Sequence, residues 1–293
     1  MPAYRFCDDI LYPYVQISSQ YKKLRTQEAD AWIARKLEEF FEGWWLTDRR
    51  SEVKRVISGE TVTAYRAKRK LDGVAASSIK RELAVASAAV NYAISELNYD
   101  ISNPFAGRLM SQRDRKATVR RKRILTTGEV NALIVAATGV TRDIIVFAAA
   151  TGFRQSEILG LRWDHVRGDE VVFEPHEQKS GRRSVRGLSE TALAVLARRG
   201  DGEVVFALDG KRIPRRTFHS LWDDVRKRAG VDDVKFHDLR RFLATQMLAV
   251  GRMEDVKTQL GHSDIRTTQA AYAEDSIDAA KGVLGKMRGI DCG

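Results

Sequence analysis

The apolar positions of the first third of the chain recur at helical spacing. One stripe advances by alternating steps of four and three residues, which predicts an amphipathic helix. Its members are Ile79, Leu83, Ala86, Val90, Ala93 and Leu97. Apolar residues from Trp32 to Trp44 and the segment 59–70 predict two further helices. Asn103-Pro104 ends the region, because the residue before a proline avoids helical angles. We expect a small helical bundle whose aromatic side chains form its core.

The last 170 residues also have a mainly helical pattern. Thr126 with Glu129 three residues later has the spacing of a capping box at a helix start. The apolar run 144–150 stops at Gly152, and its alanine content favours a buried helix over a strand. Leu239 to Val250 carry a helical apolar face that Gly251 ends.

One short stretch of the second region has the character of a β-hairpin. The β-prone runs 171–173 and 184–188 flank the turn-forming segment 179–182. The fold class predicted is therefore mainly α: a helical bundle followed by an α-rich (α+β) domain with one small antiparallel β-sheet.

Composition excludes several classes of protein. The 293 residues are 43% hydrophobic and 30% charged, as in ordinary globular proteins. Apolar runs stay below the roughly 18 residues that a membrane span needs, and the first residues lack the pattern of a signal peptide. Cys7 and Cys292 are too few for a disulfide framework and lack metal-site spacing. We expect a cytoplasmic location, nucleoid-associated in a bacterial or archaeal host.

The net charge of +11 is concentrated in one segment. Residues 1–107 and 124–293 each carry a net +2, whereas 108–123 carries +7. An isolated charge run is usually a solvated surface, but this one separates two nearly neutral regions, as a linker touching a polyanion would. Nucleic acid is the first partner to consider; an acidic membrane surface and a nuclear-localisation tract are weaker alternatives. The candidate DNA-binding residues are Arg113, Arg115, Lys116, Arg120, Arg121, Lys122 and Arg123.

The second region carries chemical side chains in a fixed order. They are Arg154 and Glu157, Lys179, His237 and Arg240, His262, and last Tyr272. Arginines bind phosphate through a planar fork, and a tyrosine hydroxyl can be a covalent nucleophile. Tyr272 is the only tyrosine after Tyr99. Taken singly, each of these residues is more often structural, and His165, His176 and His219 are assigned structural roles.

Three segments together resemble the signature boxes of the tyrosine recombinases, the phage-integrase family. They are ATGFRQSEILGLRWDHV, HDLRRFLATQML and LGHSDIRTTQAAY. In the first region, VTAYRAKR and SSIKRELAVASAAVNYAI resemble that family's helical core-binding (SAM-like) domain. The resemblance implies a core-binding domain over 1–107, a basic interdomain linker over 108–123, and a catalytic domain with a C-terminal tail helix over 124–293.

The resemblance also implies a reaction. Tyr272 would attack a scissile DNA phosphodiester, giving a 3′-phosphotyrosine and a free 5′-hydroxyl. Arg154 and Arg240 would hold the non-bridging oxygens, where charge accumulates in the transition state. Glu157 would orient Arg154 or a neighbouring group.

Proton transfer would fall to the remaining groups. Lys179 would protonate the departing 5′-oxygen, although other basic residues of the hairpin stay open as alternatives. These are Arg182, Arg183 and Arg186. His262 would hydrogen-bond the phosphate, and His237 would do the same or accept the tyrosine proton. The resemblance implies neither ATP nor a metal, and we expect no cofactor.

The implied function is site-specific recombination or integration of a mobile element at double-stranded DNA sites. The implied assembly is a homo-tetramer on DNA, with residues 276–293 docking on a neighbouring subunit and accessory bending or directionality proteins as possible partners. The alternatives are a type IB topoisomerase, a chromosome-dimer resolving recombinase, and a catalytically idle DNA-binding regulator.

Two features depart from the family's pattern. His262 and Tyr272 are ten residues apart where nine is usual. One extra helical residue turns a side chain by about 100°, so we expect an irregularity before Tyr272. The chain also starts close to the core-binding segment, so a two-domain architecture without an arm-binding domain is expected.

Overall fold

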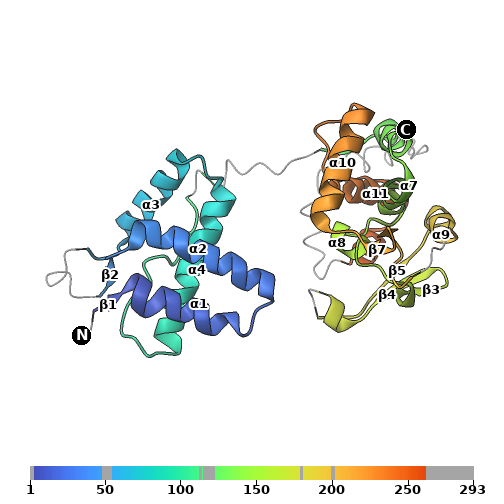
Figure 1. Ribbon diagram of the computed structural model, residues 1–293. Helices are drawn as coiled ribbons and strands as arrows, with labels where there is room; N and C mark the ends of the chain where they lie inside the picture. Colours follow the sequence, from blue (N-terminus) through green and yellow to red (C-terminus); the bar gives the residue numbers. More distant parts are fainter. Residues whose placement is uncertain are drawn as a thin grey trace, which may run out of the picture. The chain divides into compact units, whose positions relative to one another are not determined.

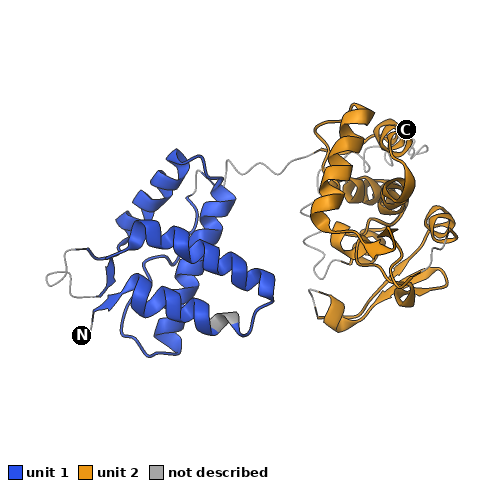
Figure 2. Ribbon diagram, in the orientation of Figure 1, with its two compact units in different colours: residues 1–121 blue, residues 122–293 orange. Residues whose placement is uncertain are grey.

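The chain forms two compact units, residues 1–121 and 122–293, each with its own hydrophobic core (Figures 1 and 2). The computed structural model describes residues 3–47, 55–111, 114, 123–178, 181–198 and 202–261. Helices dominate both units, which confirms the mainly α fold class. None of the helices within these ranges is long and apolar enough to cross a bilayer.

Unit 1 is a helical bundle with one minimal strand pair. In chain order its elements are β1 (Tyr4–Arg5), the π-helical η1 (Phe6–Leu11), α1 (Tyr12–Ser19), α2 (Leu24–Phe41), β2 (Trp45–Leu46), α3 (Gly59–Leu71) and α4 (Ala76–Ser95). The three helices predicted from apolar stripes are present as α2, α3 and α4. Trp44 follows α2 and does not belong to it.

The core of unit 1 is aromatic. Phe6, Phe41 and Phe105 are fully buried, and the ring centroids of Phe41 lie 5.4 Å from Phe6 and 5.8 Å from Phe105. Most of the aromatic stripe of α2 therefore packs inward, as predicted. Trp32 differs: it is 53% exposed, with the Lys36 ammonium 6.0 Å from its ring centroid.

The beginning of the basic segment 108–123 is held by unit 1. The backbone carbonyl of Arg108 accepts a hydrogen bond from Arg66 Nη1 at 3.1 Å, and Leu109 packs on the core. Asp114 pairs with Lys70 of α3 at 2.6 Å. These contacts hold Arg108 and Asp114 of the predicted linker on unit 1. Residues 112, 113 and 115–122 lie outside the described ranges, and the domain division stays a prediction.

Unit 2 combines packed helices with small antiparallel sheets. Its elements are α6 (Thr127–Ala136), α7 (Gly139–Thr151), α8 (Gln155–Ile158), η2 (Trp163–His165), β3 (Val166–Arg167), β4 (Glu170–Phe173), η3 (Pro175–Glu177), β5 (Ser184–Gly187), α9 (Glu190–Leu196), β6 (Ala207–Leu208), β7 (Lys211–Arg212), α10 (Arg215–Ala229), α11 (His237–Val250) and α12 (Met253–Leu260). The predicted capping box is present at α6, since Thr126 Oγ1 accepts from the Glu129 amide and Glu129 Oε2 accepts from the Thr126 amide.

The predicted hairpin exists, but its sheet is larger than expected. β4 pairs antiparallel with β5, with Val172 opposite Val185, and β3 adds a third strand. The turn η3 lengthens the connection between β4 and β5. Besides the predicted sheet, β1–β2 in unit 1 and β6–β7 in unit 2 form two further antiparallel pairs that the sequence did not predict. Their strands are two residues long, too short to show a period of two in the sequence.

Candidate active site

The end of α7 directs the chain into the first signature segment. Gly152 adopts the left-handed conformation, with φ of 67°, that commonly ends a helix, and its amide donates to the Ala148 carbonyl. Two residues later Arg154 precedes α8. Its backbone amide donates to Glu157 Oε2 at 2.8 Å, which closes the first turn of that helix.

Arg154 and Glu157 also meet through their side chains. Arg154 Nη1 lies 2.8 Å from Glu157 Oε1. The Arg154 side chain is 40% exposed, whereas that of Glu157 is only 10% exposed. Desolvation raises the pKa of the Glu157 carboxyl, but the hydrogen bonds and charge of Arg186, with Arg154, outweigh it and lower the pKa to about 2. Glu157 is therefore a carboxylate at neutral pH and an anchor for an accessible guanidinium.

Arg240 reaches the same place from α11. It is 3% exposed, and Nη1 donates to the Gly152 carbonyl at 2.8 Å while Nη2 donates to the Leu260 carbonyl at 2.5 Å. Arg154 Nη2 lies 3.5 Å from the next carbonyl, that of Gly261. Both arginines thus face the carbonyl end of α12, where the helix dipole favours positive charge. The ends of α7, α11 and α12 converge on one cationic cluster.

His237 opens α11 one turn before Arg240. Desolvation of the imidazole, then the positive charge of Arg240, lowers the pKa of His237, and Arg154 adds to this effect. A lowered pKa favours the neutral ring, which can accept a proton at neutral pH. The structure therefore brings together Arg154, Glu157, His237 and Arg240, all of which were singled out from the sequence.

The other predicted site residues in this unit lie outside the described ranges. These are Lys179, His262 and Tyr272. The same holds for the irregularity expected between His262 and Tyr272 and for the predicted tail helix, which also lie outside the described ranges. Gly261, the residue directly before His262 in the sequence, ends α12 in the left-handed conformation with φ of 58°. The roles assigned to all these residues stay predictions.

Among the candidate linker contacts, only Arg123 is described, and it already has anionic partners. It pairs with Glu129, and its Nε lies 3.3 Å from Asp233 Oδ1. These ion pairs tie Arg123 to α6 and to the loop before α11. The other six candidates lie outside the described ranges: Arg113, Arg115, Lys116, Arg120, Arg121 and Lys122.

Two residues next to the cluster have contacts that sequence reasoning did not predict, since it considered Arg186 only as an alternative proton donor and did not name Gln259. Arg186 of β5 is 1% exposed and binds Glu157. Gln259 of α12 bridges Gly187 and the end of α7, accepting from the Gly187 amide at 3.1 Å and donating to the Gly187 and Thr151 carbonyls at 3.0 Å. Strand alternation could have found Arg186, because it shares a face with buried Leu188.

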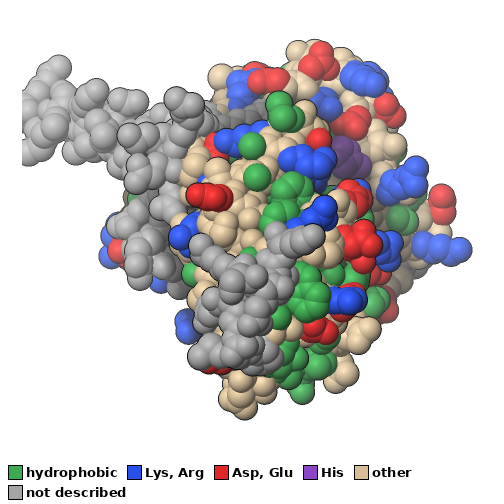
Figure 3. Space-filling view, turned by 90° about the vertical axis from the view of Figure 1, so that its left-hand side faces the viewer, with side chains coloured by type: hydrophobic (Ala, Val, Ile, Leu, Met, Phe, Trp, Pro, Cys, Tyr) green, Lys and Arg blue, Asp and Glu red, His purple; other side chains and the backbone are tan. Residues whose placement is uncertain are grey.

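His165, one of the three histidines assigned structural roles, is buried and has a hydrogen-bond partner. His165 is 5% exposed, with Nε2 2.8 Å from Glu177 Oε1. No group of His, Cys, Asp and Glu able to hold a metal ion occurs within the described ranges. On the face shown in Figure 3, basic and acidic side chains are intermingled, with no large area of one sign among the described atoms.

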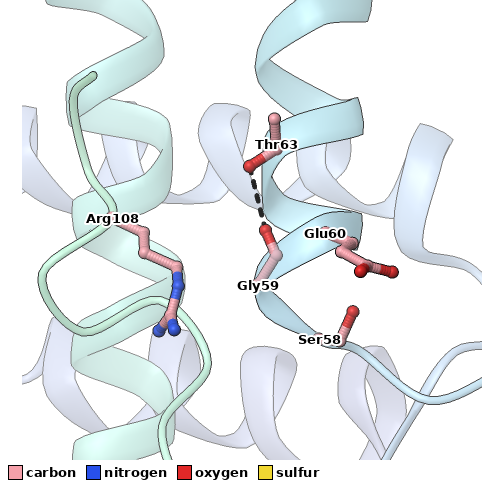
Figure 4. Close-up of a pocket in the computed structure, with 5 residues that line it drawn as sticks. All are labelled: Ser58, Gly59, Glu60, Thr63 and Arg108. Atoms are coloured by element: carbon pink, nitrogen blue, oxygen red, sulfur yellow. Dashed lines mark hydrogen bonds between the residues drawn. The ribbon is translucent and has the colours of Figure 1, made fainter. Parts of the chain in front are cut away.

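Unit 1 has a hollow of about 530 Å³ at the start of α3, lined by Ser58, Gly59, Glu60, Thr63 and Arg108 (Figure 4). Arg108 lies so close to α3 that a Cβ on Gly59 would be 2.6 Å from its Nε. Thr63 Oγ1 donates to the Gly59 carbonyl at 3.0 Å, within the helix. The lining holds one acid and one cation, so the hollow does not repeat the cationic cluster of unit 2.

Helices converge on paired arginines, a histidine and a carboxylate in an α-rich fold, and guanidinium groups are well suited to bind phosphate. Residues 123–277, more than half of the chain, match the model of the phage integrase family. The chain belongs to this family.

Curated relatives agree with this assignment. The chain is 28% identical over 158 residues to the integrase of Salmonella phage P22, covering 48% of this chain and 41% of that protein. It is 33% identical over 100 residues to tyrosine recombinase XerC of Bifidobacterium longum (strain DJO10A), covering 34% and 28%. The matched parts span less than half the length of these relatives.

The fold matches two integrase structures over most of the chain. A Tn1549 transposon integrase in complex with circular intermediate DNA superposes with a TM-score of 0.72 at 18% identity, covering 96% of this chain and 99% of the other. A lambda integrase dimer bound to a COC′ core site gives a TM-score of 0.71 at 19% identity, covering 89% and 75%.

Proposed function

We propose that this protein is a site-specific DNA recombinase that cleaves and rejoins strands through a 3′-phosphotyrosine intermediate. The observation that carries the proposal is the cluster of Arg154, Glu157, His237 and Arg240 in a chain of the phage integrase family. Accessible Arg154 contacts the scissile phosphate, and buried Arg240 adds a fixed positive charge beneath it.

In the proposed cleavage step, one phosphorus–oxygen bond replaces another. The Tyr272 oxygen forms a bond to phosphorus while the bond to the 5′-oxygen breaks. His237, neutral because its pKa is lowered, takes the tyrosine proton. Lys179 gives a proton to the leaving 5′-oxygen, and reversal of these steps rejoins the strands. The phosphotyrosine keeps the phosphodiester energy, so the reaction needs no ATP.

The decisive experiment uses a suicide DNA substrate that carries the attachment site of the chain's own element. We expect a covalent protein–DNA adduct that is lost in Tyr272→Phe. An adduct that survives this substitution would contradict the assignment of the nucleophile. Strand exchange between two sites, without relaxation of a plasmid lacking them, distinguishes a recombinase from a type IB topoisomerase; an idle regulator gives neither result.

The proposed partners are double-stranded DNA sites and three further copies of this chain. A lambda integrase of the same fold is known as a tetramer bound to a Holliday junction. If residues 276–293 dock on a neighbouring subunit, their deletion should leave cleavage of a single site partly intact and impair synapsis. Normal recombination by the truncated protein would contradict docking. Integration of a mobile element and resolution of chromosome dimers differ in the sites that the protein recombines.

A further inference from the structure

Arg186 is a buried cation next to the cluster of Arg154, Glu157, His237 and Arg240. It belongs to β5, far from Arg154 in sequence, and its side chain is fully buried. Burying a guanidinium costs several kcal/mol unless every donor is well paired. An apolar residue here would bury its side chain next to Leu188 without that cost. Packing alone therefore does not explain why an arginine occupies this position.

The guanidinium of Arg186 is held on its edges and faces. Nη1 lies 2.7 Å from Glu157 Oε2, Nη2 lies 3.1 Å from Glu157 Oε1, and Nε donates to Ser184 Oγ at 3.1 Å. Its central carbon lies 4.9 Å from the ring centroid of Phe153 and 5.4 Å from that of Phe173. The two parallel hydrogen bonds from the guanidinium fix the plane of the Glu157 carboxylate, and the two phenylalanine rings fix the plane of the guanidinium.

Glu157 passes this constraint on to Arg154. Each carboxylate oxygen is shared: Oε2 accepts from Arg186 Nη1 and the Arg154 amide, and Oε1 accepts from Arg186 Nη2 and Arg154 Nη1. Arg186 and Arg154 are the charged groups that lower the pKa of the carboxyl from β5 and from the start of α8. The orientation of the half-exposed Arg154 guanidinium is therefore set by a buried cation on another element.

Arg186 also lies against the end of α12. A Cβ at Gly261 would be only 2.6 Å from Arg186 Nη2, and Gly261 has a positive φ. The neighbouring residue Gly187 pairs with Gln259 through both its amide and its carbonyl. The same strand thus supports Glu157 and the segment that leads to His262.

We propose that Arg186 is a positioning residue that fixes Glu157 and, through it, holds Arg154 in the orientation that binds the scissile phosphate. The inference rests on the proposed recombinase function. Arg186 itself does not contact the DNA. Removing it should slow cleavage by about 10- to 100-fold, as loss of a group that orients a ligand-binding side chain does.

The test compares two suicide substrates, one ordinary and one with a neutral methylphosphonate at the scissile position. The methyl group removes the charge that Arg154 neutralises, so an arginine acting on that charge matters less on the second substrate. We expect Arg154→Ala and Arg186→Met to be slow on the phosphodiester and to recover to within about threefold of the unsubstituted protein on the methylphosphonate. Arg198→Met, on an exposed ion pair with Asp143, is the matched control and should be normal on both.

A defect of Arg186→Met that is equally large on both substrates would overturn the proposal, because it would show a structural role alone. Where Arg186→Met does not fold, the double variant Glu157→Gln/Arg186→Met removes both buried charges and keeps the test usable. It should melt cooperatively and still show the substrate-dependent defect; normal cleavage of the phosphodiester by this variant would also overturn the proposal. If the unsubstituted protein forms no adduct on either substrate, the recombinase function itself is wrong.

Discussion

At the scale of single residues, the carboxylate of Glu157 links the chemistry of the cluster to its stability. Its pKa lies at about 2 although desolvation alone would raise it, because Arg186 and Arg154 favour the charged form. A depressed pKa stabilises the fold at pH values above the unfolded pKa of 4.5, and this contribution is lost as the pH falls towards 2. The full contribution is about 3 kcal/mol.

Glu157→Gln should therefore change how the stability of unit 2 depends on pH. We expect a loss of about 3 to 5 kcal/mol at pH 6.5, because Arg186 loses its charged partner. Between pH 6.5 and about 3, the free energy of unfolding should fall by about 2 kcal/mol less in the variant than in the unsubstituted protein. Hydrogen exchange of the buried amides of α7 measures both values. Exposed Glu170→Gln is the control, and equal pH slopes for Glu157→Gln and the unsubstituted chain would contradict the prediction.

The residues of the site differed in how far the sequence could specify them. The spacing of Arg154 and Glu157 on one turn predicts their pairing, and His237 and Arg240 share a helix in the same way. Nothing local predicts that the two pairs meet, because Arg240 bonds Gly152, which is 88 residues away, and Arg154 bonds Gly261, which is 107 residues away. Arg186 was considered only as an alternative proton donor, because its buried partner Glu157 is distant in sequence.

At the scale of elements, helix ends place the cluster, and the end of α7 at Gly152 is crowded by two other helices. A Cβ there would lie 2.9 Å from Leu243 Cδ2 and 3.0 Å from Leu260 Cδ2, contacts from α11 and α12. Gly230 ends α10 with nearly the same φ, 68°, and a Cβ there would meet nothing within 4 Å. The two glycines therefore separate backbone strain from crowding.

Gly230→Ala should cost about 1 kcal/mol, the penalty for a left-handed alanine. Gly152→Ala should cost about 1 to 3 kcal/mol more, because the side chains of Leu243 of α11 and Leu260 of α12 must shift to make room. The larger loss should come with slower adduct formation, since those helices carry Arg240 and precede His262. Thermal unfolding and suicide-substrate cleavage measure the two effects. Equal stability of the two variants would show that the crowding at Gly152 is relieved with no loss of free energy of unfolding.

Elements with strong local signals were predictable from the sequence, and those without them were not. The capping box at Thr126, the apolar run before Gly152 and the face of α11 each specify a helix by short-range chemistry. The pairs β1–β2 and β6–β7 are held together by contacts between distant or very short segments, so no periodicity marks them.

At the scale of the whole molecule, charge is the property on which the proposed binding of DNA depends. Each unit's sequence is close to neutral outside 108–123, so bulk attraction comes mainly from that segment. Two of its described residues are already engaged: Asp114 pairs with Lys70, and Arg123 pairs with Glu129 and Asp233. We expect the residues between them to bind phosphates without reading sequence.

Replacing Arg120, Arg121 and Lys122 by glutamine should therefore reduce the salt slope of DNA binding by about 0.9 for each phosphate that is no longer neutralised. Arg123→Gln should change the slope by much less, because its guanidinium is paired with acids of its own unit, and should instead destabilise the start of α6. The matched control replaces Arg120 and Arg121 by lysine, which keeps the charge and should keep the slope. Titration of DNA binding over a range of salt concentrations measures all three variants. An unchanged slope in the triple glutamine variant would mean that the segment is a solvated linker. Arginines of the two folded units would then make all the phosphate contacts.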